Sequence, residues 1–372
     1  MARLEDVCEI LDNKRIPITA KDRVAGPYPY YGANGVQDYV AEYIFDDELV
    51  LLAEDGGHFG SSDKPIAYRV SGKCWVNNHA HVLKPRKFID VDYLCYSLMF
   101  RDVSDIVNGA TRQKLTQADM RKIDIPLPPI GEQQIIAEKI GKVFELIALR
   151  KEQLAKLDQL VKARFVEMFG DMYLNTKDWT TVKLMDIADV VSGITKGRKV
   201  KEQELFEVPY MAVSNVKDGY IDWTTVKTIM ATAQEINQYR LLPNDVLMTE
   251  GGDPDKVGRG AIIKNPLENS IHQNHIFRVR LDSTKILPAF FAEYLQHQKA
   301  KRYFLGCAKQ TTGIASINMQ QLRALPVLMP PLELQEKFTS FVEQTDKTKL
   351  TLQESLDRLE VMKKALMQEY FG

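Results

Sequence analysis

The sequence predicts a mixed α/β protein in which a globular domain followed by a long helix occurs twice. The segment "IPLPPIGEQQIIAEKI" at 125–140 returns as "VLMPPLELQEKFTSFV" at 327–342, with Gln133 matching Gln335 at the same offset as the paired prolines. Short β-rich runs separated by Gly, Pro and Asn precede each copy, and a long proline-free segment follows each. The predicted fold class is therefore two globular domains separated by two long helices that form an antiparallel coiled coil, related by a pseudo-twofold internal repeat.

Length and composition are those of an ordinary globular protein. The 372 residues allow roughly two to three domains. No apolar run reaches the length of about 18 residues that a membrane span needs, and the N-terminus has no secretory signal, so we expect a cytoplasmic protein without a membrane partner. The four cysteines are scattered, which favours reduced thiols. A net charge of −1 argues against nucleic-acid binding by bulk electrostatics alone, but it allows a local basic surface or a partner that supplies positive charge.

The repeat divides the chain into four consecutive segments. We predict a first domain at 1–114, a Pro-Pro turn and helix at 115–170, a second domain at 171–315, and a second turn and helix at 316–372. Weaker matches in constant order support the repeat inside the domains, and they place the following residues on one another: Glu54 on Glu250, Asn78-His79 on Asn274-His275, and Pro29-Tyr30 on Pro209-Tyr210.

The two helices should begin at the Pro-Pro turns and pair with each other. Proline is tolerated just before a helix, so the helices should start near Gly131 and Glu333. Each is about 39 residues long, with apolar residues at a sustained 3.5-residue spacing that is typical of a coiled coil. An alternative is that each helix packs on its own domain. The predicted seam consists of Ile140, Val143, Ile147, Leu154, Leu157, Val161, Val342, Leu352, Leu356, Leu359 and Leu366.

Motifs for catalysis are missing from the sequence. It has no phosphate-binding loop, no glycine turn for a dinucleotide or S-adenosylmethionine, and no aromatic residue after either Pro-Pro pair as an amino-methyltransferase would show. His79 and His81, or His272 and His275, could ligate a metal, but neither pair has a nearby Cys or acidic complement in the sequence. We therefore expect no catalytic residues and no metal site in this chain.

Several loops are rich in side chains that suit nucleic acid. Arg, Gln and Asn can make bidentate contacts to base edges, while Lys, Ser and Thr suit phosphates. The candidate DNA-binding residues are Tyr30, Tyr31, Asn34, His58, Ser61, Lys64, Arg112, Gln113, Lys114, Lys196, Arg198, Lys199, Lys309, Gln310, Thr311 and Thr312. We expect the set at 112–114 and the set at 309–312 to occupy equivalent places in the two halves.

The arrangement resembles the specificity subunit of type I restriction-modification systems. The resemblance is carried by the two "PP…Q" turns that open long helices, by the duplicated halves, and by "YPYYGANG" and "VNNHAHVL". It departs from a strict repeat where Glu132 in the first turn is matched by Leu334, which concerns the helix cap.

The resemblance implies a non-catalytic subunit with two target-recognition domains, each recognising one half of a bipartite site in double-stranded DNA. It further implies that the coiled coil spaces these domains and docks two modification subunits, which bring S-adenosylmethionine and methylate adenine. Restriction (motor-nuclease) subunits would join them, so Mg and ATP are expected in the partners and no cofactor in this chain. Two alternatives remain: a coiled-coil adaptor whose globular ends bind proteins and not DNA, and a nuclease or methylase with an undetected site.

Overall fold

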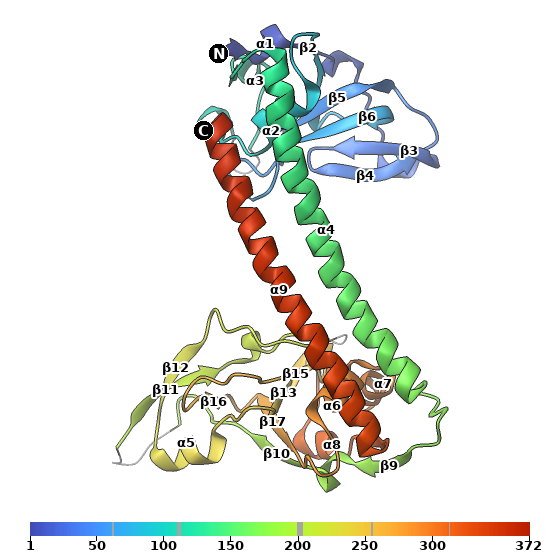
Figure 1. Cartoon of the computed structure of the whole chain (residues 1–372), viewed down its shortest axis with the longest axis vertical. Helices are drawn as coiled ribbons and strands as arrows, with labels where there is room; N and C mark the ends of the chain where they lie inside the picture. Colours follow the sequence, from blue (N-terminus) through green and yellow to red (C-terminus); the bar gives the residue numbers. More distant parts are fainter. Residues whose placement is uncertain (62, 110–112, 199–203, 254–255, 312) are drawn as a thin grey trace. The chain divides into compact units, whose positions relative to one another are not determined.

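A computed structural model describes residues 1–61, 63–109, 113–198, 204–253, 256–311 and 313–372 (Figure 1). The chain forms two compact units. The first unit contains Met1–Glu152 together with Leu352–Gly372, and the second contains Gln153–Thr351. Each unit combines sheets with helices, so the predicted mixed α/β class is confirmed.

A six-stranded sheet forms the centre of the first unit. Its strands, in spatial order, are β2 (Cys8–Ile10), β7 (Ala80–Pro85), β5 (Phe45–Ala53), β6 (Ala67–Val76), β3 (Ala25–Gly32) and β4 (Gly35–Val40). All neighbours are antiparallel except β3 and β6, which are parallel. The other strands of the unit's globular part are β1 (Ala2–Arg3) and β8 (Asp124–Ile125), which pair with each other, and its α-helices are α1 (Leu4–Val7), α2 (Val91–Met99) and α3 (Gln117–Met120). Short 3-10 helices lie at Asp12–Lys14, Ala20–Asp22 and Ser104–Ile106.

Several small sheets build the globular part of the second unit. One has the order β10 (Ala188–Ser192), β17 (Ile276–Leu281), β13 (Val246–Thr249) and β15 (Gly260–Ile262), and another has β12 (Lys227–Ala231), β11 (Phe206–Met211) and β16 (Ile271–His272). The others are β14 (Gly251–Gly252), β19 (Ile314–Ser316) and β18 (Lys309–Thr311), and the pair β20 (Pro326–Met329) with β9 (Thr180–Lys183). The helices are α5 (Ala233–Tyr239), α6 (Pro288–Gln296), α7 (Gln298–Cys307) and α8 (Met319–Arg323).

Strand pairing confirms the weaker internal matches. Tyr30 pairs in parallel with Trp75, and Tyr210 pairs in parallel with Ile271, so Tyr30 and Tyr210 hold the same place in their sheets. The amide of Glu54 bonds to the carbonyl of His79 at 2.9 Å, and the amide of Glu250 bonds to that of His275 at 3.0 Å. The repeat is thus a repeat of topology as well as of sequence.

The two long helices are α4 (Ile130–Phe169) and α9 (Leu332–Phe371). Each begins directly after its second proline, within one residue of the predicted start. The carbonyls of Pro129 and Pro331 accept helix-type hydrogen bonds from the amides of Gln133 and Gln335, four residues later. Proline has no N–H, but a residue at this position needs no helical donor. Each helix starts in one unit and ends in the other.

Inside each unit the parts of α4 and α9 run antiparallel. In the first unit Lys139 contacts Tyr370 at 3.4 Å and Lys151 pairs with Glu360 at 3.0 Å. In the second unit Asp158 pairs with Lys349 at 2.5 Å, and the rings of Phe165 and Phe338 lie 5.4 Å apart. In both units, residues later in α4 contact residues earlier in α9, as expected for an antiparallel pair of helices. All eleven predicted seam residues are buried or half-buried.

The alternative, that helices pack on the globular domains, also holds at the helix ends. Ile136 and Ile140 belong to the buried core of the first unit, against which Leu366 and Phe371 of α9 also pack. In the second unit Phe165 and Phe169 of α4 share a core with Phe338 of α9. Each globular domain therefore buries the start of one long helix and the end of the other.

Candidate nucleic-acid interface

Three loops with candidate DNA-binding residues meet on the first unit. The side-chain amide of Asn34, between β3 and β4, donates to the carbonyl of Gly56 at 3.0 Å. The amide of Gly56, after β5, donates to the carbonyl of Gln113 at 3.3 Å. Both Asn34 and Gln113 have exposed side chains. These contacts join segments distant in sequence into one surface, which we call the first loop surface (Asn34, Gly56 and Gln113).

Gln113 lies next to a backbone pairing between Asn108 and Lys114, which we call the first hairpin, and the second unit has its counterpart. Asn108 and Lys114 exchange two backbone hydrogen bonds, and Lys114 also bridges to Asp55. In the second unit Ser316 pairs in the same way with Lys309 and with Gly251. Lys114 and Ser316 each lie fourteen residues before the first proline of their Pro-Pro turn.

This pairing corrects the expected equivalence of 112–114 with 309–312. Gly252 pairs with Ala315, as Gly56 bonds to Gln113, so the partner of Gln113 in the repeat is Ala315. Lys309 instead matches Asn108, in the first strand of the hairpin. Lys309 is exposed, and the backbone of Gln310 and Thr311 lies in β18. Arg112, Lys199 and Thr312 lie outside the described residues.

Tyr30 is a wrong prediction for DNA contact. Its side chain is 1% exposed, its hydroxyl contacts the backbone of Ile18, and the Arg23 guanidinium lies 4.2 Å from its ring centre. Tyr31 is half-buried beside Tyr68, with ring centres 5.8 Å apart, and burial raises its pKa. The tyrosines of "YPYYGANG" therefore hold the hairpin, and Asn34 is the part of the motif that reaches the surface.

The candidates at 58–64 lie on a turn. Ser61 accepts hydrogen bonds from the amides of Asp63 and Lys64 at 3.3 and 3.1 Å, so its hydroxyl stabilises the turn locally. His58 is half-buried and Lys64 is exposed. Lys64 is thus the member of this group best placed for a phosphate.

A buried ion-pair network lies beneath the hairpin of the first unit. It consists of Asp12, Arg15, Glu54 and His81. Arg15 bonds to Glu54 at 2.5 Å, and His81 Nδ1 lies 2.6 Å from Asp12 Oδ2. Lys114 joins it from the surface through Glu54 Oε1 at 2.9 Å. Burial favours a higher pKa for both acids, but hydrogen bonds and the positive charges of His81 and Arg15 outweigh it, so the pKa of Asp12 and that of Glu54 are lowered.

The acidic neighbours of His81 overturn the expectation that it has none. Asp12, Glu54 and His81 bring ligand atoms within 4.8 Å of one another, but their donor set does not fit a metal ion. Asp12 already accepts from the Val82 amide at 2.8 Å and from Gln117 at 2.9 Å as well as facing His81. The Glu54 oxygens are held by Arg15 and Lys114, so protein cations occupy the places a metal would take.

The loop at 193–198 in the second unit is fixed by Arg198. Its guanidinium makes a bidentate pair with Glu235 of α5 at 2.5 and 2.6 Å and donates to the Met230 carbonyl at 3.0 Å. This side chain anchors the loop, and its expected role as a DNA contact stays a prediction. The hydrogen bond from Arg198 lowers the pKa of Glu235 to about 2. Lys196 on the same loop is exposed.

An Asn-His pair joins the loops of the second unit and was not among the candidate DNA-binding residues. The Asn274 amide bonds to the Ile194 carbonyl at 3.0 Å, which ties it to the loop at 193–198. His275 Nδ1 lies 2.6 Å from Glu250 Oε2, and more than half of its side chain is exposed. The matching His79 pairs with Asp55 at 2.7 Å. The sequence feature that could have indicated this pair is the repeated "NH" dipeptide. It was used to align the two halves, but it does not by itself show that the histidine is exposed.

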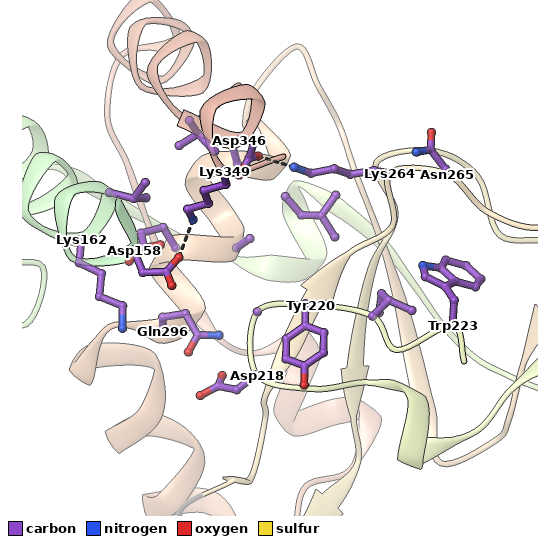
Figure 2. Close-up of a pocket in the computed structure, with 18 residues that line it drawn as sticks. Asp158, Lys162, Asp218, Tyr220, Trp223, Lys264, Asn265, Gln296, Asp346 and Lys349 are labelled. Carbon is purple, nitrogen blue, oxygen red and sulfur yellow. Dashed lines mark hydrogen bonds and ion pairs between the residues drawn. The ribbon is translucent and has the colours of Figure 1, made fainter. Parts of the chain in front are cut away.

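A separate cleft of about 730 Å³ lies beside the helices of the second unit (Figure 2). Its walls come from α4, α6, α9, β15 and the segments 218–223 and 264–265. The ion pairs Asp158–Lys349 and Asp346–Lys264 lie in it. Three lysines and four acidic residues line it, so its charges suit a protein partner better than a phosphate backbone. None of the predicted DNA-binding residues that the structure describes lines this cleft.

None of the helices in the described part of the chain has a stretch apolar enough to cross a membrane.

Comparisons with known proteins agree with this architecture. A sequence model of the type I restriction modification DNA specificity domain matches residues 1–159 and 176–361. The chain is 27% identical to a Haemophilus influenzae protein provisionally named a type I restriction enzyme specificity subunit, over 98% of this chain and 94% of that protein. It is 24% identical to the EcoKI specificity subunit of Escherichia coli, over 80% of this chain and 67% of the relative.

Solved structures show the same fold. The S subunit of the type I restriction-modification system from M. genitalium superposes with a TM-score of 0.63 at 14% identity, over 100% of this chain and 95% of that one. A chain from a study of type I complex assembly and conformational transition superposes with a TM-score of 0.54 at 16% identity, over 100% and 96%.

The duplicated fold and these matches define the class as the specificity subunits of type I restriction-modification systems, whose family role is DNA-sequence specificity. This chain belongs to the type I restriction modification DNA specificity family.

Proposed function

We propose that this chain recognises a bipartite site in double-stranded DNA, with one half-site for each globular domain. The observation that carries the proposal is the repeated hairpin: Asn108–Lys114 in the first unit and β18–β19 in the second occupy the same place before their Pro-Pro turns. Exposed Asn34 and Gln113 present groups that suit base edges in the first unit. Lys196 and Lys309 present groups that suit phosphates in the second.

The long helices are the proposed docking site for two modification subunits. Ile135, Leu146 and Leu149, in the part of α4 that belongs to the first unit, are each more than 40% exposed, and a period of about 3.6 residues places them on one face of that helix. Leu160 and the residue that matches it in the repeat, Met362, are 47% and 50% exposed. This one pair of equivalent exposed apolar residues, one on each helix, supports two equivalent partners.

The near-neutral charge fits a chain that works inside a larger complex. With a net charge of −1, the chain lacks the excess of cations that would bind DNA strongly by itself. We propose that the modification subunits supply phosphate contacts, S-adenosylmethionine and adenine methylation. Restriction subunits supply the Mg- and ATP-dependent functions, and this chain contributes sequence selection without catalysis.

The experiment is methylation mapping combined with binding. The chain is co-expressed with the modification subunits of its own system, and methylated adenines are mapped across a genome. The expected result is one bipartite consensus with a fixed spacer, together with selective binding of that duplex over a scrambled duplex across a salt series. Binding of partner proteins with no selection among duplexes would overturn the proposal and favour the protein-binding adaptor. Methylation by the isolated chain would indicate an undetected catalytic site.

A further inference from the structure

The residues that lie beneath the hairpin differ between the two units. In both, a glutamate carbonyl accepts from the residue after the hairpin: Leu115 donates to Glu54 at 2.7 Å and Ile317 donates to Glu250 at 2.8 Å. Only beneath the first hairpin does the buried network of Asp12, Arg15, Glu54 and His81 lie.

Strand register shows what replaces the network in the second unit. His81 is opposite Leu52 on the neighbouring strand, and Phe277 is opposite the matching Met248. On the other side of the same strand, Ser192 holds the place of Asp12 and faces Phe277. Phe277 is 3% exposed within an apolar core. Apolar side chains therefore pack beneath the second hairpin, in the place that the ion-pair network has in the first unit.

His81 is at the centre of the first network. Its side chain is 0% exposed, Nδ1 lies 2.6 Å from Asp12, and Nε2 lies 2.9 Å from the carbonyl of Leu115. Glu54 lies 3.7 Å from Nδ1, and Arg15 bonds to both acids and to the Ala80 carbonyl. A carbonyl oxygen can only accept, so Nε2 must donate its hydrogen to Leu115. A second proton must lie between Nδ1 and the Asp12 carboxylate, because two lone pairs would otherwise face each other.

Three side-chain contacts connect this network to the hairpin and the turn that follows it. His81 bonds to Leu115, Gln117 Nε2 donates to Asp12 at 2.9 Å, and Lys114 pairs with Glu54 at 2.9 Å. The carbonyl of Gln113, one residue before Lys114, accepts from Gly56 in the first loop surface. The position of Gln113 is therefore coupled to the buried charges through consecutive residues of one hairpin.

We propose that His81 is a positioning residue that fixes the first hairpin for base recognition, so that sequence discrimination depends on buried charges at one half-site and not at the other. This inference rests on the proposed function of the hairpins in DNA recognition. His81 does not touch DNA itself. It sets the place of Gln113 through Leu115.

The test uses two substitutions that divide the contacts of the imidazole. In His81→Gln the side-chain amide reaches the place of Nε2 and keeps the donor to Leu115, whereas in His81→Asn the shorter amide reaches the place of Nδ1 and keeps only Asp12. Discrimination is measured by competition binding of the complex with its modification subunits, against duplexes altered in one half-site at a time. His81→Asn should lose about tenfold in discrimination at the half-site of the first domain, and His81→Gln should retain most of it.

The second half-site is the internal control and should be unchanged in both variants. Gln117→Leu, which removes the contact to Asp12 without altering the histidine, should likewise relax the first half-site alone, and it serves if the His81 variants do not fold. Equal loss at both half-sites, or full discrimination in His81→Asn and Gln117→Leu, would overturn the inference while the proposed function stands. A wild-type complex that discriminates at neither half-site would instead remove the proposed function.

Discussion

Gln133 and Gln335 make the same three hydrogen bonds in two different domains. The Gln133 side chain accepts from the Asp90 amide at 2.9 Å and donates to the carbonyls of Phe88 and Pro128 at 3.1 and 2.8 Å. The Gln335 side chain accepts from the Leu287 amide at 2.9 Å and donates to the carbonyls of Lys285 and Pro330 at 3.4 and 2.9 Å.

Both glutamines are fully buried. The amides that they accept from, those of Asp90 and Leu287, belong to the N-cap residues of α2 and α6. The glutamine of the repeated "PP…Q" pattern thus links three segments through its hydrogen bonds. It joins the Pro-Pro turn, the first turn of the long helix and the N-terminus of α2 or α6.

Replacing either glutamine with leucine should destabilise the domain that contains it. Gln133→Leu and Gln335→Leu keep most of the volume but leave one amide and two carbonyls without partners, which should lower the free energy of unfolding by about 2–4 kcal/mol. Thermal and urea unfolding measure the loss. Gln134→Leu, an exposed neighbour on the same helix, is the control and should stay within about 0.5 kcal/mol of wild type.

A charge in the helix seam should destabilise the pairing. Leu356 is 7% exposed and Ile147 is 6% exposed, so Leu356→Asp and Ile147→Asp should each cost about 3–5 kcal/mol. Leu350→Asp, on the same helix as Leu356 but 63% exposed, controls for the helix propensity of aspartate. If the seam and control variants unfold at the same denaturant concentration as wild type, the helices do not pair as described.

Exposed positions on the helices should affect assembly and leave stability unchanged. Leu160→Glu and Met362→Glu alter equivalent exposed residues, so each should remove one modification subunit from the complex. Native mass spectrometry should count one bound subunit in each single variant and none in the double variant, while melting temperatures stay at the wild-type value. Two bound subunits in the double variant would place the docking surface elsewhere.

Recognition should divide between the hairpins. Gln113→Ala should weaken discrimination only at the half-site of the first domain, by roughly 1–3 kcal/mol, because a base contact is lost there. Lys309→Ala should weaken binding to every duplex and reduce the salt dependence, as expected for a phosphate contact. Competition binding against half-site variants decides between these roles, and an equal loss for all duplexes in Gln113→Ala would assign that residue to the backbone.

The Arg198–Glu235 pair should make the second unit sensitive to acid. The hydrogen bond from Arg198 lowers the pKa of Glu235 to about 2, below its unfolded value of about 4.3. A lowered pKa stabilises the folded state above the unfolded value, and this stabilisation is lost as the pH falls from about 5 to about 2. Glu235→Gln should therefore melt below wild type at pH 7, and the difference should shrink through that range. A difference that does not depend on pH would show that the ionised pair contributes nothing.

Local patterns in the sequence predicted the architecture well. Prolines at 128–129 and 330–331 predicted where the long helices begin, because a proline ring is excluded from a helix interior but not from its start. The apolar spacing predicted residues of α4 and α9 that are buried or half-buried, but the predicted seam did not include Phe165, Phe169 and Phe338, which pack in the core of the second unit. These features depend on residues a few positions apart, and a single sequence records such relations directly.

The candidate site was predicted less well because its contacts are distant in sequence. His81 meets Asp12, 69 residues away, and Asn34 meets Gly56, 22 residues away. Tyr30 lies in a glycine-rich stretch that indicates a surface turn, yet a parallel pairing with Trp75 places it in the core. No periodicity records a parallel pairing between strands separated by another hairpin, so only the structure could separate Asn34 from its buried neighbours.

The packing of the last helix has a consequence for how the chain is made. Leu366 and Phe371 pack against the core of the first unit, and the ring of Phe371 lies 5.2 Å from that of Tyr93. During synthesis the first domain leaves the ribosome long before these residues exist, so its apolar surface must wait until this part of α9 has been made or be shielded by another protein. A stop codon before Leu366 would therefore damage the domain that was translated first.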